Sequence, residues 1–271
     1  MSRTPLPPQS RRERRAQARL DQPAAPRRRS TRNQPKPRWQ SPVVLVTAAA
    51  VLIGVAVIAF ARPPATTPGA ELVNPSTAYA AALVDGEAAG AADAPVVLEL
   101  YSDFQCPACR QFVTQQLPRL ISEFVQPGIL RIEARDIDIL GTGTPSESLQ
   151  LAAGATCAAA QNRYWQFHDY VFWNQGRENK GDHDAAFIAR VADAAGVDRT
   201  PWDTCVAGPE ARAAVTATTS AALGLGINQT PTLVVNGQRF AGVPNYDQLA
   251  ALIRQLAASP APGTSSAPTA S

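Results

Sequence analysis

The feature that most constrains this chain is a pair of cysteines three residues apart, Cys106 and Cys109, in the stretch DFQCPACR. A run of β-prone residues, 96–101, ends shortly before the pair, and Pro107 lies where a helix would begin. Proline suits the first turn of a helix because the backbone N–H that it lacks would have no intrahelical partner there. The order therefore predicts a buried strand, a short loop and a helix that carries both cysteines in its first turn.

Such a junction would give the two sulfurs different environments. Cys106 would cap the helix N-terminus, where free N–H groups and the helix dipole stabilise a thiolate. Cys109 would lie one turn further on, covered by Cys106, where it could attack a mixed disulfide. We therefore predict a redox pair, with a static disulfide or two packed thiols as the structural alternatives.

Other uses of a CxxC motif need residues that this chain does not supply. A zinc or iron–sulfur site needs two more ligands at suitable spacing. Cys157 and Cys205 are single cysteines, and His168 and His183 are the only histidines. A c-type haem motif needs histidine directly after the second cysteine, where Arg110 stands. We expect no metal and no cofactor.

The chain on either side of the motif continues an α/β pattern. A helix is expected from Pro107 to about Phe124, with a kink at Pro118. Strand, helix and strand in that order predict a βαβ unit with a parallel sheet, and Asn236-Gly237 predicts a type I′ hairpin turn. The other expected elements are a short strand within 79–84, strands at 129–135, 232–235 and 238–241, Ala-rich helices within 146–223, and a closing helix at 246–257.

An uncharged apolar run, residues 43–61, precedes this domain. At about 1.5 Å per residue, a helix of this length nearly spans the hydrocarbon core of a bilayer. The run is too apolar for an amphipathic helix of a soluble domain, and Arg38, Trp39 and Arg62 flank it as interfacial residues do. We therefore predict a single transmembrane helix.

The charges on the two sides of this run predict its orientation. Residues 1–42 hold eleven Arg and one Lys against two acidic residues, a net charge of +10, so the remainder of a +3 chain carries −7. The positive-inside rule then places the basic arm in the cytoplasm and the folded domain outside it. A cleaved signal peptide is the competing interpretation because Ala59-Phe60-Ala61 resembles a cleavage site. Both interpretations export the domain.

The basic arm alone could suggest nucleic-acid binding, but Trp39 is its only aromatic residue and it contains no recognisable binding motif. Its Pro, Gln, Ser and Arg content predicts disorder, and we expect no nucleic-acid partner. The expected organisation is a disordered cytoplasmic arm at 1–42, a transmembrane helix at 43–61, a linker at 62–81, a folded domain at 82–258 with a helical block at about 145–225, and a disordered tail at 259–271.

Three segments in this order carry a family resemblance. The stretch 97–110 with its SDFQCPAC core, the tripeptide Thr230-Pro231-Thr232 and the turn Asn236-Gly237 resemble the DsbA-like branch of the thioredoxin superfamily. The similarity covers roughly residues 82–257, helical block included, and is closest to exported or membrane-tethered members from actinobacteria and Gram-positive bacteria. It implies an α/β thioredoxin fold with an inserted helical domain.

The resemblance also implies roles for particular residues. Cys106 would be the nucleophile and Cys109 the resolving cysteine, with Pro107 and Ala108 as active-site neighbours. Pro231 would be a cis-proline that faces the pair and brings the backbone of Thr230 beside Cys106, where it could pair with an extended substrate peptide.

Two departures limit what the resemblance implies. Many relatives place a buried acidic residue six positions before the first cysteine, where Leu100 stands here. Its neighbour Glu99 should face the opposite side of the sheet by strand alternation. Strongly oxidising relatives have histidine between the cysteines, where this chain has Ala108, so the oxidising strength cannot be transferred.

Relatives with cysteines in the helical block pair them. The resemblance therefore implies a structural Cys157–Cys205 disulfide, which an oxidising compartment permits and which would stabilise the fold by about 4–5 kcal/mol in the chain-entropy account. A second redox pair that relays electrons is the alternative.

The implied function is a membrane-anchored, extracytoplasmic thiol–disulfide oxidoreductase that introduces disulfides into reduced exported proteins. Its expected partner is a membrane reoxidase, either a vitamin K epoxide reductase homologue or a DsbB-like protein. A disulfide isomerase or reductase, and a non-catalytic peptide-binding module of the thioredoxin type, are the alternatives. An isomerase usually dimerises, and we find no dimerisation module, so we expect a monomer.

Overall fold

The computed structural model describes residues 71–259. The predicted arm, the apolar run 43–61 and nearly all of the predicted tail lie outside these residues. Within 71–259, no helix is long and apolar enough to cross a membrane.

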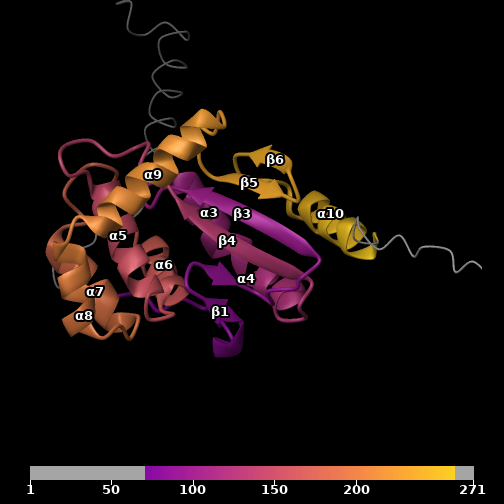
Figure 1. Ribbon diagram of the computed structural model, residues 1–271, viewed down its shortest axis with the longest axis horizontal. Helices are drawn as coiled ribbons and strands as arrows, with labels where there is room; N and C mark the ends of the chain where they lie inside the picture. Colours follow the sequence, from indigo (N-terminus) through magenta and orange to yellow (C-terminus); the bar gives the residue numbers. More distant parts are fainter. Residues whose placement is uncertain (1–70, 260–271) are drawn as a thin grey trace, which may run out of the picture. The chain divides into compact units, whose positions relative to one another are not determined.

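A six-stranded sheet, in the order β1-β2-β4-β3-β5-β6, forms the centre of the domain. The central strand β3 pairs in parallel with β4 and antiparallel with β5, so the predicted parallel βαβ unit is confirmed. Figure 1 shows the sheet with helices gathered at both of its sides. The strands are β1 Val84–Asp85, β2 Ala88–Ala89, β3 Val96–Ser102, β4 Leu130–Asp136, β5 Thr232–Val235 and β6 Gln238–Ala241.

Five helices, α5 to α9, lie between β4 and β5 in the chain and form the helical insertion. In Figure 1, α5 to α8 gather beside the sheet, and α9 runs back towards β5. The helices are α3 Pro107–Gln115, α4 Leu117–Leu120, a π-helical turn Ile121–Val125, α5 Glu147–Ala159, α6 Tyr164–Trp173, α7 Ala185–Ala194, α8 Arg199–Ala207, α9 Glu210–Gly224 and α10 Tyr246–Ala258.

Side chains of the expected kinds begin these helices. Pro107 occupies the first turn of α3, and Ser146 caps α5 by accepting a hydrogen bond from the N–H of Leu149 at 3.0 Å. Asp184 caps α7 and Asn245 caps α10 in the same way. Local sequence therefore marks where α3, α5, α7 and α10 start.

The sheet and the insertion share one continuous hydrophobic core. On the sheet side, Leu98 and Leu100 of β3 are fully buried, together with Phe112 of α3. On the insertion side, Trp165 and Phe167 of α6 are fully buried in the same cluster. Because the core is shared, the insertion packs directly against the elements that carry the cysteine pair.

Two expectations need correction. The predicted single helix 107–124 is divided, because Pro118 has no N–H to donate within a continuous helix; α3 ends at Gln115, and α4 and a π-helical turn follow. The predicted strand within 79–84 is wrong, since residues 81–83 form a 3₁₀ turn and β1 starts at Val84.

The segment 71–80 also differs from the linker predicted there. The amide of Asn174 clasps Val73, accepting from its N–H at 2.7 Å and donating to its carbonyl at 3.0 Å. Tyr79 stacks on Trp165 and donates its hydroxyl to Asp169 at 3.0 Å. This segment, called the strap below, lies against α6, so the packed domain extends further towards the N-terminus than residue 82.

Candidate active site

The junction between β3 and α3 positions the two cysteines. The loop 103–105 leaves β3, and the N–H of Cys106 donates to the carbonyl of Asp103 at 2.9 Å, which closes the turn. Cys106 has extended backbone angles, φ −72° and ψ 119°, and is the N-cap of α3. The N–H of Arg110 then donates to the Cys106 carbonyl as the first hydrogen bond of the helix. The sulfur of Cys106 therefore lies at the end of the helix where N–H groups are free.

The environment of Cys106 favours its ionised form. Its pKa is lowered to about 6, chiefly by a hydrogen bond from the Cys109 thiol, which outweighs the opposing effect of burial. The Thr230 side chain and the N–H groups of Cys109 and Ala108 lower it further. The side chain keeps slight access to solvent, with 6% of its surface exposed. At neutral pH, Cys106 is therefore a partly accessible thiolate.

The environment of Cys109 has the opposite effect. The residue is fully buried, and burial raises the pKa of its thiol; the hydrogen bond to Cys106 and the charge on Cys106 raise it further. The two cysteines are free thiols in the structure. The pair thus combines one sulfur that ionises readily with one that holds its proton and donates to it.

The loop before β5 faces this pair. The peptide bond between Thr230 and Pro231 is cis, and the Cys106 sulfur lies 3.3 Å from the Thr230 carbonyl oxygen, to which it donates when it is protonated. Pro231 is buried, and Thr230 is half-buried. The structure therefore brings Thr230 to the two cysteines, although more than a hundred residues separate it from them in the chain.

Polar side chains buried in the loop 103–105 were missed by the sequence analysis. The carboxylate of Asp103 accepts from the N–H of Gln105 at 2.9 Å and from the hydroxyl of Ser148 in α5 at 2.7 Å. It also accepts from the N–H groups of Ile139 and Leu140, each at 3.0 Å. Burial raises the pKa of Asp103 despite these bonds. The signal available in sequence was a pair of polar residues around a phenylalanine directly before the cysteines.

The position six residues before Cys106 carries no acid. Leu100 is fully buried, whereas Glu99 is one-third exposed and lies 3.4 Å from Arg135 as an ion pair. Glu99 thus faces away from the buried side of β3, as strand alternation indicated.

The two other cysteines lie apart from the pair. Cys157 of α5 and Cys205 of α8 are joined by a disulfide within the insertion. Neither histidine is bonded to the pair. His168 is fully buried among aromatic rings with Nδ1 2.8 Å from Asp169, and His183 lies 2.9 Å from Glu147. His183 therefore packs within the insertion, whereas the ring of His168 also meets Phe104 of the loop before Cys106, with centroids 5.8 Å apart.

A second buried polar group, also missed from sequence, lies between the sheet and the insertion. Asp136 at the end of β4 accepts from the Tyr164 hydroxyl at 2.8 Å and from the Ser102 hydroxyl at 3.3 Å. Burial, followed by the charge of Glu87, raises the pKa of Asp136, and burial also raises the pKa of Glu87. Both carboxyl groups line a cavity of about 240 Å³.

Across residues 71–259, no cluster of three or more His, Cys, Asp or Glu side chains could hold a metal ion.

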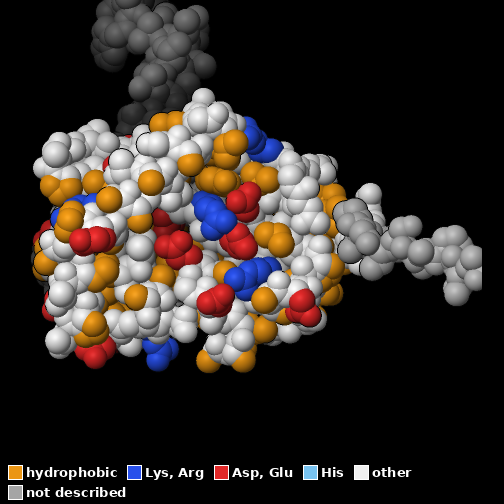
Figure 2. All heavy atoms as spheres, viewed as in Figure 1, with side chains coloured by type: hydrophobic (Ala, Val, Ile, Leu, Met, Phe, Trp, Pro, Cys, Tyr) orange, Lys and Arg blue, Asp and Glu red, His pale blue; other side chains and the backbone are white. Residues whose placement is uncertain are grey.

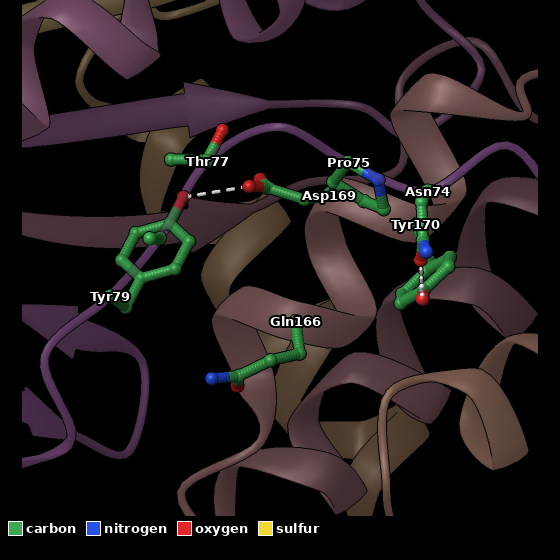
Figure 3. Close-up of a pocket in the computed structure, with 8 residues that line it drawn as sticks. Asn74, Pro75, Thr77, Tyr79, Gln166, Asp169 and Tyr170 are labelled. Atoms are coloured by element: carbon green, nitrogen blue, oxygen red, sulfur yellow. Dashed lines mark hydrogen bonds between the residues drawn. The ribbon is translucent and has the colours of Figure 1, made fainter.

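Another cavity, of about 250 Å³, lies between the strap and α6. Figure 3 shows Tyr79 reaching across to Asp169 and Tyr170 meeting Asn74 at its edges. Gln166 also lines it. Since none of these residues touches the cysteines, we assign this cavity to the docking of the strap.

Charges of both signs are interspersed on the face seen in Figure 2, in the region where Figure 1 places the sheet. Arg131 and Arg135 of β4 form ion pairs with acidic neighbours, including Glu133. This face therefore has no one-signed basic patch of the kind that binds nucleic acid.

Comparisons with known proteins agree with this geometry. A protein-family model described as thioredoxin matches residues 83–255. The probable disulfide bond formation protein D of Bacillus cereus is 32% identical over 92 residues, 34% of this chain and 41% of that protein. The crystal structure of oxidised BdbD from Bacillus subtilis superposes with a TM-score of 0.57 at 18% identity, covering 70% of this chain and 100% of that one, which shows a shared fold.

A different kind of protein also contains a similar stretch. The Na(+)/H(+) antiporter NhaA 3 of Salinispora tropica is 26% identical over 170 residues, 63% of this chain but 24% of that protein. The chain thus spans less than half the length of these two curated relatives.

Proposed function

The chain belongs to the thioredoxin superfamily, in its DsbA-like branch, and we propose that it is a thiol–disulfide oxidoreductase that oxidises exported proteins outside the cytoplasm. One observation carries the proposal: Cys106 ionises with a pKa of about 6, while burial raises the pKa of Cys109. Stabilising one thiolate stabilises the reduced form, which makes the disulfide form a stronger oxidant.

The reaction follows from these two environments. A substrate thiolate attacks the Cys106 sulfur of the Cys106–Cys109 disulfide; a mixed disulfide forms, and the Cys109 sulfur leaves and takes up a proton. A second substrate thiolate attacks the substrate sulfur of that mixed disulfide and releases Cys106 as a thiolate. Two substrate thiols become one disulfide, and two electrons pass to the pair. A thiolate of low pKa is a good leaving group, so the second step is fast.

The loop of Thr230 and Pro231 is proposed to bind the substrate. Its carbonyl lies beside the Cys106 sulfur, so an extended peptide placed there would present its own cysteine to that sulfur. Pro107 and Ala108, on the first turn of α3, would form the adjacent rim of the site.

Regeneration requires an external oxidant, since the pair ends each cycle with two thiols. We propose a membrane quinone reductase, either a vitamin K epoxide reductase homologue or a DsbB-like protein, with the apolar run 43–61 holding the monomeric domain near it. Carbonate extraction of membranes, followed by protease treatment of intact cells, tests this anchor. Loss of the chain from the carbonate-washed membranes, or protection of the domain from protease, would contradict it.

Oxidative refolding of a reduced exported protein tests the activity. The oxidised domain should accelerate disulfide formation, and Cys106→Ser should abolish this acceleration. Cys109→Ser, first converted to a mixed disulfide between Cys106 and glutathione, should exchange glutathione for a substrate with a single cysteine and accumulate a mixed disulfide between substrate and Cys106, visible on a non-reducing gel. Undiminished activity in Cys106→Ser would end the proposal and favour a peptide-binding module. Rearrangement of scrambled disulfides without net oxidation would favour an isomerase.

A further inference from the structure

The helical insertion contacts the loop that precedes Cys106 through one buried amide. Gln175 follows α6 directly and is 2% exposed. Its side-chain Nε2 donates to the carbonyl of Phe104 at 2.8 Å and to the carbonyl of Cys106 at 3.1 Å. A residue of the insertion is thus bonded to the backbone of the nucleophile itself.

The Cys106 carbonyl is a sensitive point in the site. It belongs to the peptide unit that starts α3, and it also accepts the first helical hydrogen bond, from the N–H of Arg110 at 3.1 Å. The next N–H groups, of Ala108 and Cys109, are the ones that stabilise the Cys106 sulfur. A donor that fixes this peptide plane therefore also fixes where those N–H groups point.

Neighbouring contacts hold the C-terminal end of α6 against residues 103–106, called the redox loop below, and against α3. The Nε of Arg110 donates to the carbonyl of Phe172 at 3.2 Å, and the rings of Phe104 and Phe172 stack with centroids 5.1 Å apart. Together with the Gln175 amide at the backbone of Cys106, these contacts join the end of α6 both to the loop before Cys106 and to α3.

The other end of the amide indicates why a glutamine is present. The Oε1 atom of Gln175 is buried and has no hydrogen-bond partner among the described residues. A buried unpaired acceptor costs free energy, and an apolar side chain of similar size would avoid that cost. The amide therefore acts here as a hydrogen-bond donor, to the carbonyls of Phe104 and Cys106.

We propose that Gln175 is a positioning residue of the redox pair, whose amide holds the carbonyls of Phe104 and Cys106 so that the first turn of α3 faces the Cys106 sulfur. This inference rests on the proposed function only for its consequence in catalysis. The geometric claim concerns the reduced domain alone and is testable without a substrate.

The variant Gln175→Met tests this role, because methionine has a similar length and no donor. The pKa of Cys106 is read from thiolate absorbance at 240 nm across pH in the reduced protein, with Cys106→Ser as the blank. We expect the pKa of Cys106 to rise from about 6 by roughly one unit. Equilibration with glutathione at pH 7 should show a pair about fivefold easier to oxidise, which corresponds to a reduction potential lower by about 20 mV.

Asn174→Leu supplies the matched control. Asn174 is the preceding residue and is also buried. Its side-chain amide is hydrogen-bonded to the backbone N–H and carbonyl of Val73 and to the carbonyl of Tyr170. This variant should lower the melting temperature and leave the pKa of Cys106 unchanged. An equal pKa shift in both variants would show general loosening of α6 and would overturn the specific role of Gln175.

A folded Gln175→Met protein with the wild-type pKa and potential would also overturn the proposal. If Gln175→Met does not fold, Gln175→Asn takes its place, since it keeps a buried amide that is one methylene too short. A wild-type pKa in that variant would count equally against the proposal. Absence of oxidase activity in the wild-type protein would defeat the proposed function, while the pKa comparison would still decide the role of Gln175.

Discussion

Cys106 and Cys109 lie one helical turn apart, and their surroundings shift their ionisation in opposite directions. Cys106 collects donors, including a thiol, a side chain and free backbone N–H groups, so its thiolate is stabilised. Cys109 is fully buried under it and keeps its proton. At the scale of single residues, this division fits the proposed reaction, in which substrate attacks the Cys106 sulfur and the Cys109 sulfur leaves and takes up a proton.

Alkylation of the reduced protein tests this division. The rate of reaction of Cys106 with iodoacetamide should follow its thiolate fraction, with a midpoint near pH 6. Between pH 7 and 8.5 the rate should therefore be nearly constant, whereas an ordinary thiol would gain about 15-fold. Mass spectrometry assigns the modified residue. A midpoint near 8.5, or modification of Cys109 first, would contradict the assignment.

Asp136 gives a prediction about stability and pH. Its pKa is raised by burial, so the folded state binds this proton more tightly than the unfolded chain does. The stability that this proton contributes is complete below the unfolded pKa and is lost as pH rises through the folded pKa. Asp136→Asn stays neutral throughout, so its melting temperature relative to wild type should rise from pH 4 to pH 8. Asp93→Asn, on an exposed loop, should show no such trend; a flat difference for Asp136→Asn would contradict the prediction.

At the scale of elements, α6 connects three parts of the domain. Its N-terminal half packs aromatic rings into the core, its outer side holds the strap, and its end leads to Gln175 at the redox loop. The strap is therefore an integral part of the domain, although the sequence alone predicted a linker for these residues.

The contact between the strap and α6 is testable through Tyr79. Removing its hydroxyl in Tyr79→Phe leaves an oxygen of the fully buried Asp169 without its partner, which should cost about 1–3 kcal/mol in urea unfolding. Tyr170→Phe is the matched control, because its partner Asn74 is exposed and water can replace the lost hydroxyl. Equal losses in the two variants would show that the buried bond is not special.

The disulfide between α5 and α8 gives a second prediction at this scale. We expect Cys157→Ser combined with Cys205→Ser to lose about 2–5 kcal/mol of stability. The pKa of Cys106 should stay at about 6 in this variant, because the bridge lies apart from the redox pair. A changed reduction potential would instead indicate that the second pair takes part in electron transfer.

Elements with strong local signals were predictable from sequence. Asn236 and Gly237 both have positive φ angles, which the expected hairpin turn requires, and the strands on either side match their predicted residues. The break near Pro118 was predictable as a kink, because Pro118 has no N–H to donate to the carbonyl of Thr114 and α3 gives way to α4 at Gln116, between these two residues. Local rules thus located the elements and left their ends to tertiary contacts.

Contacts between distant segments were not predictable in the same way. The bond from Gln175 to the Cys106 carbonyl joins residues 69 positions apart, and no local pattern marks the glutamine as special. The buried group around Asp136 likewise forms only when β4 meets α6. The candidate nucleophile could be found from its motif, whereas the residues that tune it required the fold.

At the scale of the whole molecule, the described domain has one hydrophobic core, which the sheet and the helical insertion share. The sheet and α3 supply the helix N-terminus at Cys106 and the cis-proline loop at Pro231. The insertion supplies Gln175, whose side chain is bonded to the loop before Cys106. We propose that the apolar run 43–61 anchors this domain at the outer surface of the membrane, where reduced proteins emerge. The proposed function as a whole requires that the Cys106–Cys109 pair be oxidising.

The reduction potential of the Cys106–Cys109 couple tests this requirement most directly. Reduced and oxidised domain, equilibrated with glutathione buffers at pH 7 and separated after thiol trapping, give the potential. We expect a value well above the thioredoxin value of about −270 mV and towards the DsbA value of about −120 mV, because the Cys106 thiolate stabilises the reduced form. A value at or below about −270 mV would contradict the proposed oxidase function and would identify a reductase.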